Sequence, residues 1–403
     1  MTQRPRGEDF ATPFARDRLT LLAYAMAIAS GFAVAALGPA MPSLRDDLGI
    51  SRAIGGLHFT AIAAGAVLVG FSVQSVTRAR GRRWVFWVGG AGVAAGAAVI
   101  GLTWHPAGTL LGAVLIGITG TAMLSTSQAT LSDHHPSSRA VVLTEVHTAT
   151  STGSVLPALL IGVLVFLGAG WRPAFLAPAV IVLALALAWR SVPFPPAQLE
   201  PEAGRRHREL PRSYWFFWAA FMPSVGAEWS VAAWGAGYLV DIAGATEAAA
   251  SIFMTAFFGA IAIGRFVGSR IARSVAPFPL LIGSAALALV GFLVLWGSES
   301  VAPIVASLFI TGLGISVGFP LLLTLGMNTV PDRPDEASAL VFISAGGSVA
   351  VAPFALGALA DQIGIRAAFG VVPALFVVMV ILATAGYRLS TRSDTIGSST
   401  PNP

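Results

Sequence analysis

The sequence contains no cysteine and no lysine, and it has few charged residues of either sign. The absence of cysteine excludes disulfides, thiolate metal sites and cysteine nucleophiles, and it leaves the redox compartment open. Only 11% of the 403 residues are charged, whereas 55% are hydrophobic, and the mean hydropathy is +0.78. A soluble globular protein is far less apolar. These values indicate a chain that spends most of its length in lipid.

Twelve apolar stretches follow one another along the chain, each of about 20 to 25 residues, the length that a helix needs to cross a bilayer. The first is too long for the core of a signal peptide, and Pro42 and charged residues follow it, so we expect it to be retained. The sequence predicts an all-α integral membrane protein with 12 transmembrane helices. The helices are predicted to begin near Leu19, Ala53, Trp84, Thr109, Ala140, Ala174, Tyr214, Glu247, Pro279, Val301, Ala337 and Ala367.

All 24 basic residues are arginine, and their placement explains the pI of about 10.6. If the N-terminus is cytoplasmic, 19 arginines lie in cytoplasmic loops and tails, and only Arg45, Arg52, Arg172 and Arg366 lie outside. The positive-inside rule therefore predicts that both termini are cytoplasmic. Arg265 falls near the cytoplasmic end of the eighth span, where snorkelling to the headgroups is favoured over contact with an anionic substrate. The basic pI thus reflects topology, and no nucleic-acid partner is expected.

The longest polar stretch, residues 191–213, contains prolines and a cluster of arginines and is interpreted as a cytoplasmic linker. It separates an N-terminal six-helix half (1–190) from a C-terminal six-helix half (214–388), which a cytoplasmic tail (389–403) follows. The halves repeat at an offset of about 195 residues, and such internal symmetry is typical of transporters. The offset pairs Gly117 with Gly312, Pro136 with Pro331, and Gly162 with Gly357.

Three features carry a family resemblance: the segment 38–49 at the end of the first span, the related signatures 170–175 and 364–369, and an arginine-rich loop at 78–83. On these features the chain resembles the major facilitator superfamily over nearly its whole length. The resemblance implies two pseudo-symmetric six-helix halves and transport by alternating access. Arginine in place of lysine, with much alanine, suggests a GC-rich bacterial genome and therefore the plasma (bacterial inner) membrane.

The loop after the second span matches the family motif at Gly81, Arg82 and Arg83. Gln74 and Arg78 occupy the positions where the family usually has a glycine and an aspartate. A charge-relay role proposed for that aspartate in the family is therefore not carried over to this chain.

Two further departures concern the type of transport. Ala113 stands where the drug/proton antiporters of the family typically carry an arginine, and Leu156 replaces the glycine of their Gly-Pro motif. Both departures argue against a typical multidrug antiporter. Short matches at 143–145 and 225–228 resemble the fucose-permease-like branch instead.

Glu228 and Glu145 are the acidic residues that fall well inside predicted spans. A carboxylate in the bilayer is costly unless it is hydrated, paired or protonated, so each is a functional candidate. A rise of about 1.5 Å per residue places Glu228 near mid-membrane and Glu145 close to the cytoplasm. We expect Glu228 to couple transport to protons, with Glu145 and His147 as further proton-coupling candidates. The depth of Glu145 also allows a cytoplasmic gate in which it pairs with a loop arginine. Structural hydrogen bonding is the alternative for all three.

The seventh span carries Ser230, Trp234 and Tyr238 on one helical stripe. Aromatic rings beside hydroxyls can hold a sugar ring or a flat drug, but aromatic residues also pack helices without any ligand. The stripe is a candidate substrate surface, to which Gln128 and Asn328 add hydrogen-bonding groups nearer the cytoplasm.

Glycine and proline inside two spans suggest points of bending. Gly153 with Pro157, and Gly347 with Pro353, are candidate pivots for a rocking motion between the halves. Close packing of helices is the alternative explanation for these residues.

No metal, cofactor or enzyme active site is expected. Asp133, His134 and His135 adjoin in a short loop, but the sequence shows no further ligand nearby. No glycine-rich phosphate loop is followed by lysine, and no nucleophile, base and orienting group can be assembled.

The sequence thus favours a monomeric secondary active transporter that moves a small organic solute, sugar-like or otherwise, by alternating access. Its expected partners are the small-molecule substrate, protons and the lipid bilayer. One alternative is a drug/proton antiporter that exports amphipathic compounds. Another is a non-transporting membrane receptor on the same fold, which would bind a ligand without flux.

Overall fold

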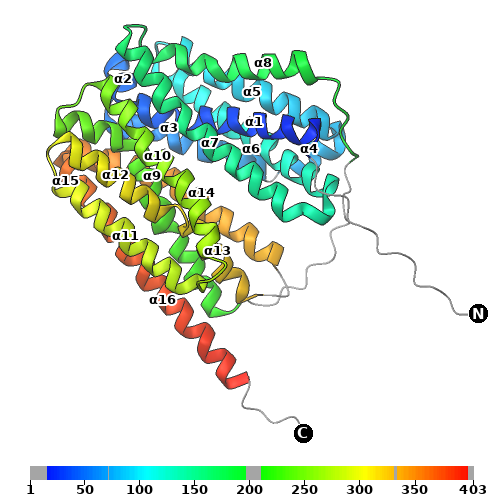
Figure 1. Ribbon diagram of the computed structural model, residues 1–403. Coiled ribbons are helices and arrows are strands. Elements are labelled where there is room, and N and C mark those ends of the chain that lie inside the picture. The colour runs from blue at the N-terminus through cyan, green and yellow to red at the C-terminus, as the bar shows by residue number, and fades with distance from the viewer. Residues whose placement is uncertain (1–15, 71, 197–209, 331–333, 398–403) are drawn as a thin grey trace, which may run out of the picture.

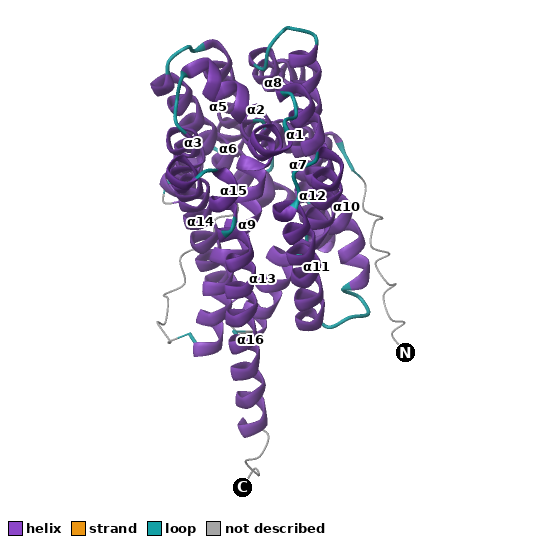
Figure 2. Cartoon of the chain, turned by 90° about the vertical axis from the view of Figure 1, so that its left-hand side faces the viewer, coloured by secondary structure: helices purple, strands orange, loops and turns teal. Residues whose placement is uncertain are grey.

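The computed structural model describes residues 16–70, 72–196, 210–330 and 334–397, and this part of the chain is helical, without a strand (Figures 1 and 2). The N-terminal half contains α1 (Arg18–Ala35), α2 (Leu37–Leu48), α3 (Arg52–Gly70), α4 (Val73–Arg80), α5 (Arg82–Leu102), α6 (Pro106–His134), the 3-10 turn η1 (Pro136–Ser138), α7 (Arg139–Phe166), η2 (Arg172–Leu176) and α8 (Ala177–Trp189). The C-terminal half contains α9 (Arg212–Ala243), α10 (Glu247–Ile271), α11 (Pro277–Gly297), α12 (Val301–Ile315), α13 (Gly318–Asn328), α14 (Pro334–Ile363), α15 (Ile365–Phe369) and α16 (Val371–Gly397).

Eleven segments of the described chain are long and apolar enough to cross a membrane. The 32-residue helix α9, which carries Glu228 at its middle, is also long enough to cross a membrane. All twelve predicted starts lie within three residues of the observed ones, so the predicted all-helical membrane fold is confirmed. The expected length was too short for several helices, since α6 has 29 residues and α14 has 30.

Local details differ from the sequence-based expectations. The first span is two helices, because α1 gives way to α2 at Ala36, and Pro42 lies inside α2. Part of the expected loop after the second span forms α4, which includes Arg78. Helix α16 continues to Gly397, into the segment predicted to be a tail. The boundaries of the linker stay predictions, since residues 197–209 lie outside the described chain.

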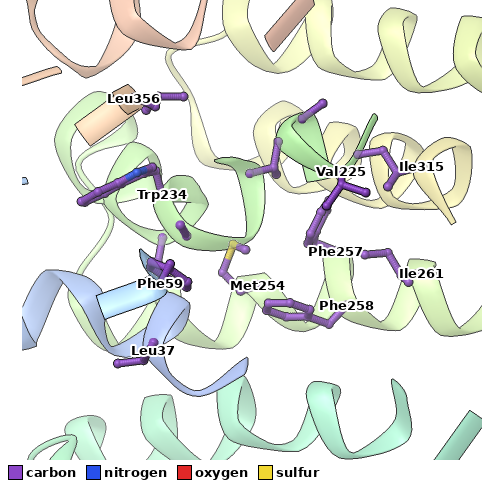
Figure 3. Packing of buried hydrophobic residues seen from close by; sticks show 14 of the residues in the cluster. Leu37, Phe59, Val225, Trp234, Met254, Phe257, Phe258, Ile261, Ile315 and Leu356 are labelled. Carbon is purple, nitrogen blue, oxygen red and sulfur yellow. The ribbon is translucent and has the colours of Figure 1, made fainter. Parts of the chain in front are cut away.

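The two halves pack together near one end and diverge toward the other, where α1 begins and α16 ends (Figure 1). Helix α3 packs against α14, α7 against α10, and α2 against α9. We call the end where α1 begins and α16 ends the terminal side and the other end the opposite side. The close-up in Figure 3 shows this junction, where Leu37 and Phe59 of the N-terminal half approach Met254 and Phe258 of α10.

The internal repeat appears as matched glycine contacts between the halves. A Cβ atom on Gly162 of α7 would lie 2.7 Å from the carbonyl oxygen of Ala248, and one on Gly357 of α14 would lie 2.6 Å from that of Arg52. The offset found in the sequence relates the two glycines to each other, and it relates Ala248 to Ala53, the residue next to Arg52. At both places a side chain would push the two backbones apart, so only glycine allows this close packing.

Candidate functional site

A cavity of about 300 Å³ lies between the two halves. Its lining residues come from five helices of the N-terminal half and two of the C-terminal half. The N-terminal half contributes Ser30, Gly31, Val34, Ala35, Gly38, Phe59, Leu124, Thr150, Ser151 and Ser154. The C-terminal half contributes Glu228, Trp229 and Ala232 from α9, and Phe257, Phe258, Ile261 and Arg265 from α10.

The charged residues that line this cavity are Glu228 and Arg265. Glu228 lies 16 residues into α9, about 24 Å along the helix axis and at the middle of this 32-residue helix. Its Oε1 atom lies 3.8 Å from Nη2 of Arg265, an ion-pair distance that is too long for a direct hydrogen bond. The Arg265 Nη1 donates to Ser151 Oγ of the other half. A chain of polar contacts therefore crosses between the halves at the cavity.

The position of Arg265 corrects the expectation that it snorkels to the headgroups. Its side chain turns into the cavity, toward Glu228 and Ser151. The physical reason is pairing, because a guanidinium inside a membrane protein gains more from a carboxylate and a hydroxyl than from an apolar surface. The alternative considered from the sequence, contact with a substrate, becomes geometrically possible at this place.

The two walls of the cavity differ in chemistry. The α9 and α10 wall is aromatic, and Trp229 also meets Phe59 across the halves edge-to-face, with ring centroids 6.1 Å apart. The α7 wall carries hydroxyls: Thr150 donates to Val146 O at 3.0 Å, and Ser151 donates to a carbonyl one helical turn earlier. Each donor is satisfied, so the hydroxyl oxygens remain able to accept hydrogen bonds. The cavity can hold an amphipathic molecule.

The predicted stripe on α9 does not line the cavity. Trp234 is 1% exposed and donates from Nε1 to Pro353 O at 2.9 Å. Tyr238 is also buried and donates to Trp296 O at 3.1 Å, while Ser230 is buried beside them. The structure gives these side chains packing contacts, and Trp229 takes the place at the cavity that the sequence assigned to Trp234.

The other predicted polar candidates lie outside the cavity lining. Gln128 is half-buried in α6, and Asn328 is exposed at the end of α13. His147 is exposed on α7, one helical turn before Ser151, and interacts electrostatically with Arg265. The structure therefore brings one of the three predicted proton-coupling residues, Glu228, into the cavity.

Glu145 lies near the terminal side within the N-terminal half. Arg16 donates from Nε to Glu145 Oε2 at 2.9 Å, and the Tyr24 hydroxyl donates to the same oxygen at 2.7 Å. Glu145 thus has an arginine partner, but this partner is Arg16, just before α1, and not a loop arginine, and it belongs to the same half as Glu145. This ion pair ties the start of α1 to α7, and it does not join the halves.

The loop motif holds the terminal side of the N-terminal half together. Gly81 has φ +83°, a backbone conformation that side chains disfavour, and it separates α4 from α5. Arg82 is buried and pairs with Asp133 at 2.6 Å, while Arg83 donates to Arg190 O. Asp133 at the end of α6 thus supplies a carboxylate to a loop that lacks the family's own aspartate.

The structure also brings a carboxylate to the two adjacent histidines, which the sequence could not show. Ligand atoms of Asp17, His134 and His135 lie within 4.8 Å of one another. His134 Nε2 lies 2.6 Å from Asp17 Oδ2, and His135 Nε2 lies 2.8 Å from Thr20 Oγ1. The expectation that no further ligand is nearby is therefore wrong. The hydrogen bonds account for the cluster without a metal, and they hold the start of α1 against the end of α6.

Two of these groups have shifted pKa values. Burial and then the neighbouring His134 lower the pKa of His135. Partial burial acts to raise the pKa of Asp17, but hydrogen bonds from Thr20 and His134 outweigh it and hold that pKa below its ordinary value. The folded state therefore favours a neutral His135 and an ionised Asp17.

The candidate pivots have unequal surroundings. Gly153 of α7 packs against the backbone of α1 at Ile28, so packing explains that glycine. A Cβ on Gly347 would meet no atom within 4 Å. Pro157 and Pro353 lie inside α7 and α14, and the Pro353 carbonyl accepts the hydrogen bond of Trp234.

The opposite side is closed by polar contacts between the halves. Arg52 Nη2 lies 2.6 Å from Asp241 Oδ2 of α9 and Nη1 lies 3.8 Å from Asp361 Oδ1 of α14. Asp361 also accepts from the backbone N–H groups of Arg52 and Ala53 at 3.0 and 2.8 Å. A carboxylate of one half therefore caps a helix of the other. Ser43 donates to Glu247 nearby.

Two pseudo-symmetric helical halves with a cavity between them, closed on one side, define a membrane transporter of the alternating-access class. The sequence model of the Major Facilitator Superfamily matches residues 23–347. The chain belongs to this superfamily, and it is a transporter and not an enzyme.

Comparison with individual proteins places the chain among transporters. An uncharacterized MFS-type transporter of Yersinia pestis is 26% identical over 370 residues, which cover 89% of this chain and 93% of that one. A glucose/galactose transporter of Brucella abortus is 30% identical over 156 residues, which cover only 36% of this chain and 35% of that transporter.

Solved structures share the fold at low sequence identity. An inward-facing, unoccupied bacterial homolog of the human lysosomal transporter Spinster superposes with a TM-score of 0.80 at 14% identity, over 95% of this chain and 98% of that one. The nucleoside transporter NupG reaches a TM-score of 0.71 at 12% identity, over 93% of this chain and 99% of that one. These similarities show the fold, and the substrate has to be argued from the cavity.

Proposed function

We propose that this protein is a proton-coupled secondary transporter that moves a small organic solute across the bacterial plasma membrane, with Glu228 as the proton-binding group. The observation that carries the proposal is the position of Glu228, which lines the cavity between the halves near mid-membrane. A carboxyl there can exchange a proton with whichever side the cavity opens to.

The arrangement of the halves supports alternating access with both termini in the cytoplasm. The contacts of Arg52 with Asp241 and Asp361 close the opposite side, while the halves diverge toward the terminal side (Figure 1). A cytoplasmic terminal side agrees with the excess of arginine in the loops at that end. In this assignment the structure is open toward the cytoplasm, and transport requires the contacts of Arg52 to break and reform.

Proton movement in proteoliposomes tests the proposal. Vesicles that contain the purified full chain and the pH dye pyranine are challenged with pooled sugars, organic acids and cationic drugs. We expect one pool to drive proton flux in the wild type, and Glu228→Gln, which keeps the side-chain shape but cannot ionise, to abolish that flux.

Glu299→Gln is the matched control, because Glu299 pairs with Arg366 in an exposed position of the C-terminal half. It should leave the flux unchanged. Equal flux in wild type and Glu228→Gln would move coupling to another residue. Ligand binding without any flux would favour a receptor, and a response confined to the drug pool would favour the efflux alternative.

A further inference from the structure

We propose that the transported solute is an amphipathic organic monoanion, whose carboxylate binds Arg265 while a proton binds Glu228, so that both cross the membrane together without net charge. This inference rests on the proposed function, because it assigns the substrate class of the same cavity. Three observations carry it: the contacts of Arg265, the charge balance of the cavity, and the chemistry of the wall beside Arg265.

Arg265 is placed to bind an anion. The guanidinium has five N–H donors, and the structure gives it a hydrogen bond to Ser151 and a longer ion pair of 3.8 Å with Glu228. Its side chain is 40% exposed, at the lining of the cavity. A carboxylate can accept two parallel hydrogen bonds from such a group, which Glu228 does not do in this structure.

Charge balance favours a monoanion that travels with a proton. With both residues ionised, the charges of Glu228 and Arg265 cancel. A proton on Glu228 leaves the charge of Arg265 unbalanced, and a bound monoanion restores neutrality. A cation bound to Glu228 would instead leave a net positive charge inside the closed cavity. Because an unbalanced charge in the membrane is costly, the neutral loaded state is the one that can reorient.

The wall beside Arg265 suits an apolar body. Ile261 lies one helical turn before Arg265 on α10, and Phe258 lies about two turns before it. The seven residue-to-residue steps from Phe258 to Arg265 span about 10 Å along the axis, the length of a bicyclic aromatic acid. Phe257 and Trp229 extend the same surface (Figure 3 shows Phe257, Phe258 and Ile261).

The pH dependence of binding has to be assigned to Glu228 and not to another titratable group. His147 of α7 interacts electrostatically with Arg265, so His147→Gln is included in the test. Helices α12 and α13, which also pack against α9, contain no charged residue. The other charged residues of the helices packed against α9 lie toward the helix ends in the sequence: Arg45, Asp46 and Asp47 in α2, Glu247 and Arg270 in α10, Asp335, Glu336 and Asp361 in α14, Arg366 in α15, and Arg388, Arg392 and Asp394 in α16.

Ligand binding to the full chain in lipid nanodiscs tests the inference, with three probes that share one body: 2-naphthoate, 2-naphthamide and 2-naphthylmethylamine. We expect the anion to bind, its affinity to rise on acidification, and the neutral amide and the amine to bind about tenfold or more weakly. Glu228→Gln should bind 2-naphthoate tightly at both acidic and neutral pH, since its side chain no longer competes for Arg265. His147→Gln should keep the pH dependence.

The arginine variants supply the matched comparison. Arg265→Gln should weaken 2-naphthoate binding about tenfold or more, whereas Arg270→Gln, on the same helix and stacked on Phe266, should not change it. Arg265→Lys retains the charge and should bind better than Arg265→Gln, which separates lost charge from misfolding.

Equal binding of the amide, preference for the amine, no anion binding at all, or an unchanged affinity in Arg265→Gln would each overturn the inference. The proton-flux experiment tests the proposed function separately from these binding results. Anion binding that depends on Arg265 but drives no proton flux would refute coupling through Glu228 and keep the anion subsite. Proton flux driven by an uncharged solute would keep proton coupling and refute the anion subsite.

Discussion

At the scale of single residues, helix α9 has side chains that line the cavity and side chains that pack against other helices within a few positions of each other. Glu228 and Trp229 line the cavity, whereas Trp234 is buried and bonded to the backbone of α14. All three occur in one continuous apolar helix. The difference between them is therefore a matter of which neighbour each side chain meets.

Two tryptophan variants test this separation. Trp234→Phe removes the donor to Pro353 O, so we expect a loss of about 1–3 kcal/mol of stability and little change in ligand affinity. Trp229→Phe should lower ligand affinity and leave stability nearly unchanged. Thermal unfolding and 2-naphthoate binding are measured on both. If Trp234→Phe weakened binding at unchanged stability, the buried stripe would belong to the site after all.

The cluster of Asp17, His134 and His135 predicts a loss of stability in acid. The lowered pKa of His135 means that, as pH falls through the ordinary histidine range, the unfolded state takes up the proton first. Asp17, whose pKa is also lowered, adds a further loss at more acidic pH. Both effects have the same sign, so folding weakens as pH decreases.

The measurement is the thermal unfolding midpoint at about pH 7.5 and about pH 5.5. We expect the unfolding midpoint to fall further on acidification in the wild type than in His135→Gln, whose side chain cannot take up a proton. His105→Gln, which alters the N-cap of α6 at its other end, should behave like the wild type. Equal losses in wild type and His135→Gln would show that the cluster does not control acid stability.

At the scale of elements, the closed state depends on two equivalent helix pairs, α3 with α14 and α7 with α10. Each pair contains a glycine that meets a backbone carbonyl of the other half at the repeat-related position, Gly357 and Gly162, and in the first pair Gly56 of α3 also meets the Pro353 carbonyl. The internal repeat therefore preserves a contact as well as a fold. These contacts occur where the halves have to separate if the opposite side opens.

Gly357→Ala tests whether the close glycine contact between α14 and α3 keeps the opposite side closed. The added methyl would lie 2.6 Å from Arg52 O, and overpacking of this kind costs about 1–3 kcal/mol. We expect the closed opposite side to become less populated. Gly347→Ala, on the same helix with nothing within 4 Å of the new methyl, is the matched control and should not shift the equilibrium. Slower transport in Gly347→Ala would instead support the proposed pivot.

At the scale of the whole molecule, Arg52 joins the halves through Asp241 and Asp361. These side chains are partly exposed, so we expect the pairs to contribute about 1 kcal/mol, which is about a fivefold change in the ratio of closed to open states. Arg52→Gln should shift the molecule toward an open opposite side by that amount. Arg366→Gln is the control, since its partner Glu299 belongs to the same half.

The absence of cysteine makes this shift directly measurable. Spin labels on two introduced cysteines, Asp46→Cys and Gln362→Cys, sit on exposed positions of different halves at the opposite side. Pulsed electron paramagnetic resonance should show a larger long-distance population in Arg52→Gln than in Arg366→Gln. Identical distance distributions would exclude Arg52 as a lock between the halves.

The sequence by itself determined the number, order and starts of the membrane helices and marked Glu228 as exceptional. The reason is local: lipid requires each span to be apolar along its length and to satisfy its own backbone, so every span is visible in isolation. An acid within such a span is equally visible. Charge also suggested an arginine partner for Glu145, but the sequence did not indicate that this partner is Arg16.

Only the tertiary structure decided which faces meet. Helices such as α9 and α10 are apolar on several sides, so their sequences do not indicate which side faces a cavity, a neighbouring helix or lipid. The long side chain of Arg265 could reach either the headgroups or the cavity, and only the neighbouring Glu228 and Ser151 settled its direction. Asp17 and His134 are separated by more than a hundred residues, and packing of α1 against α6 brought them together.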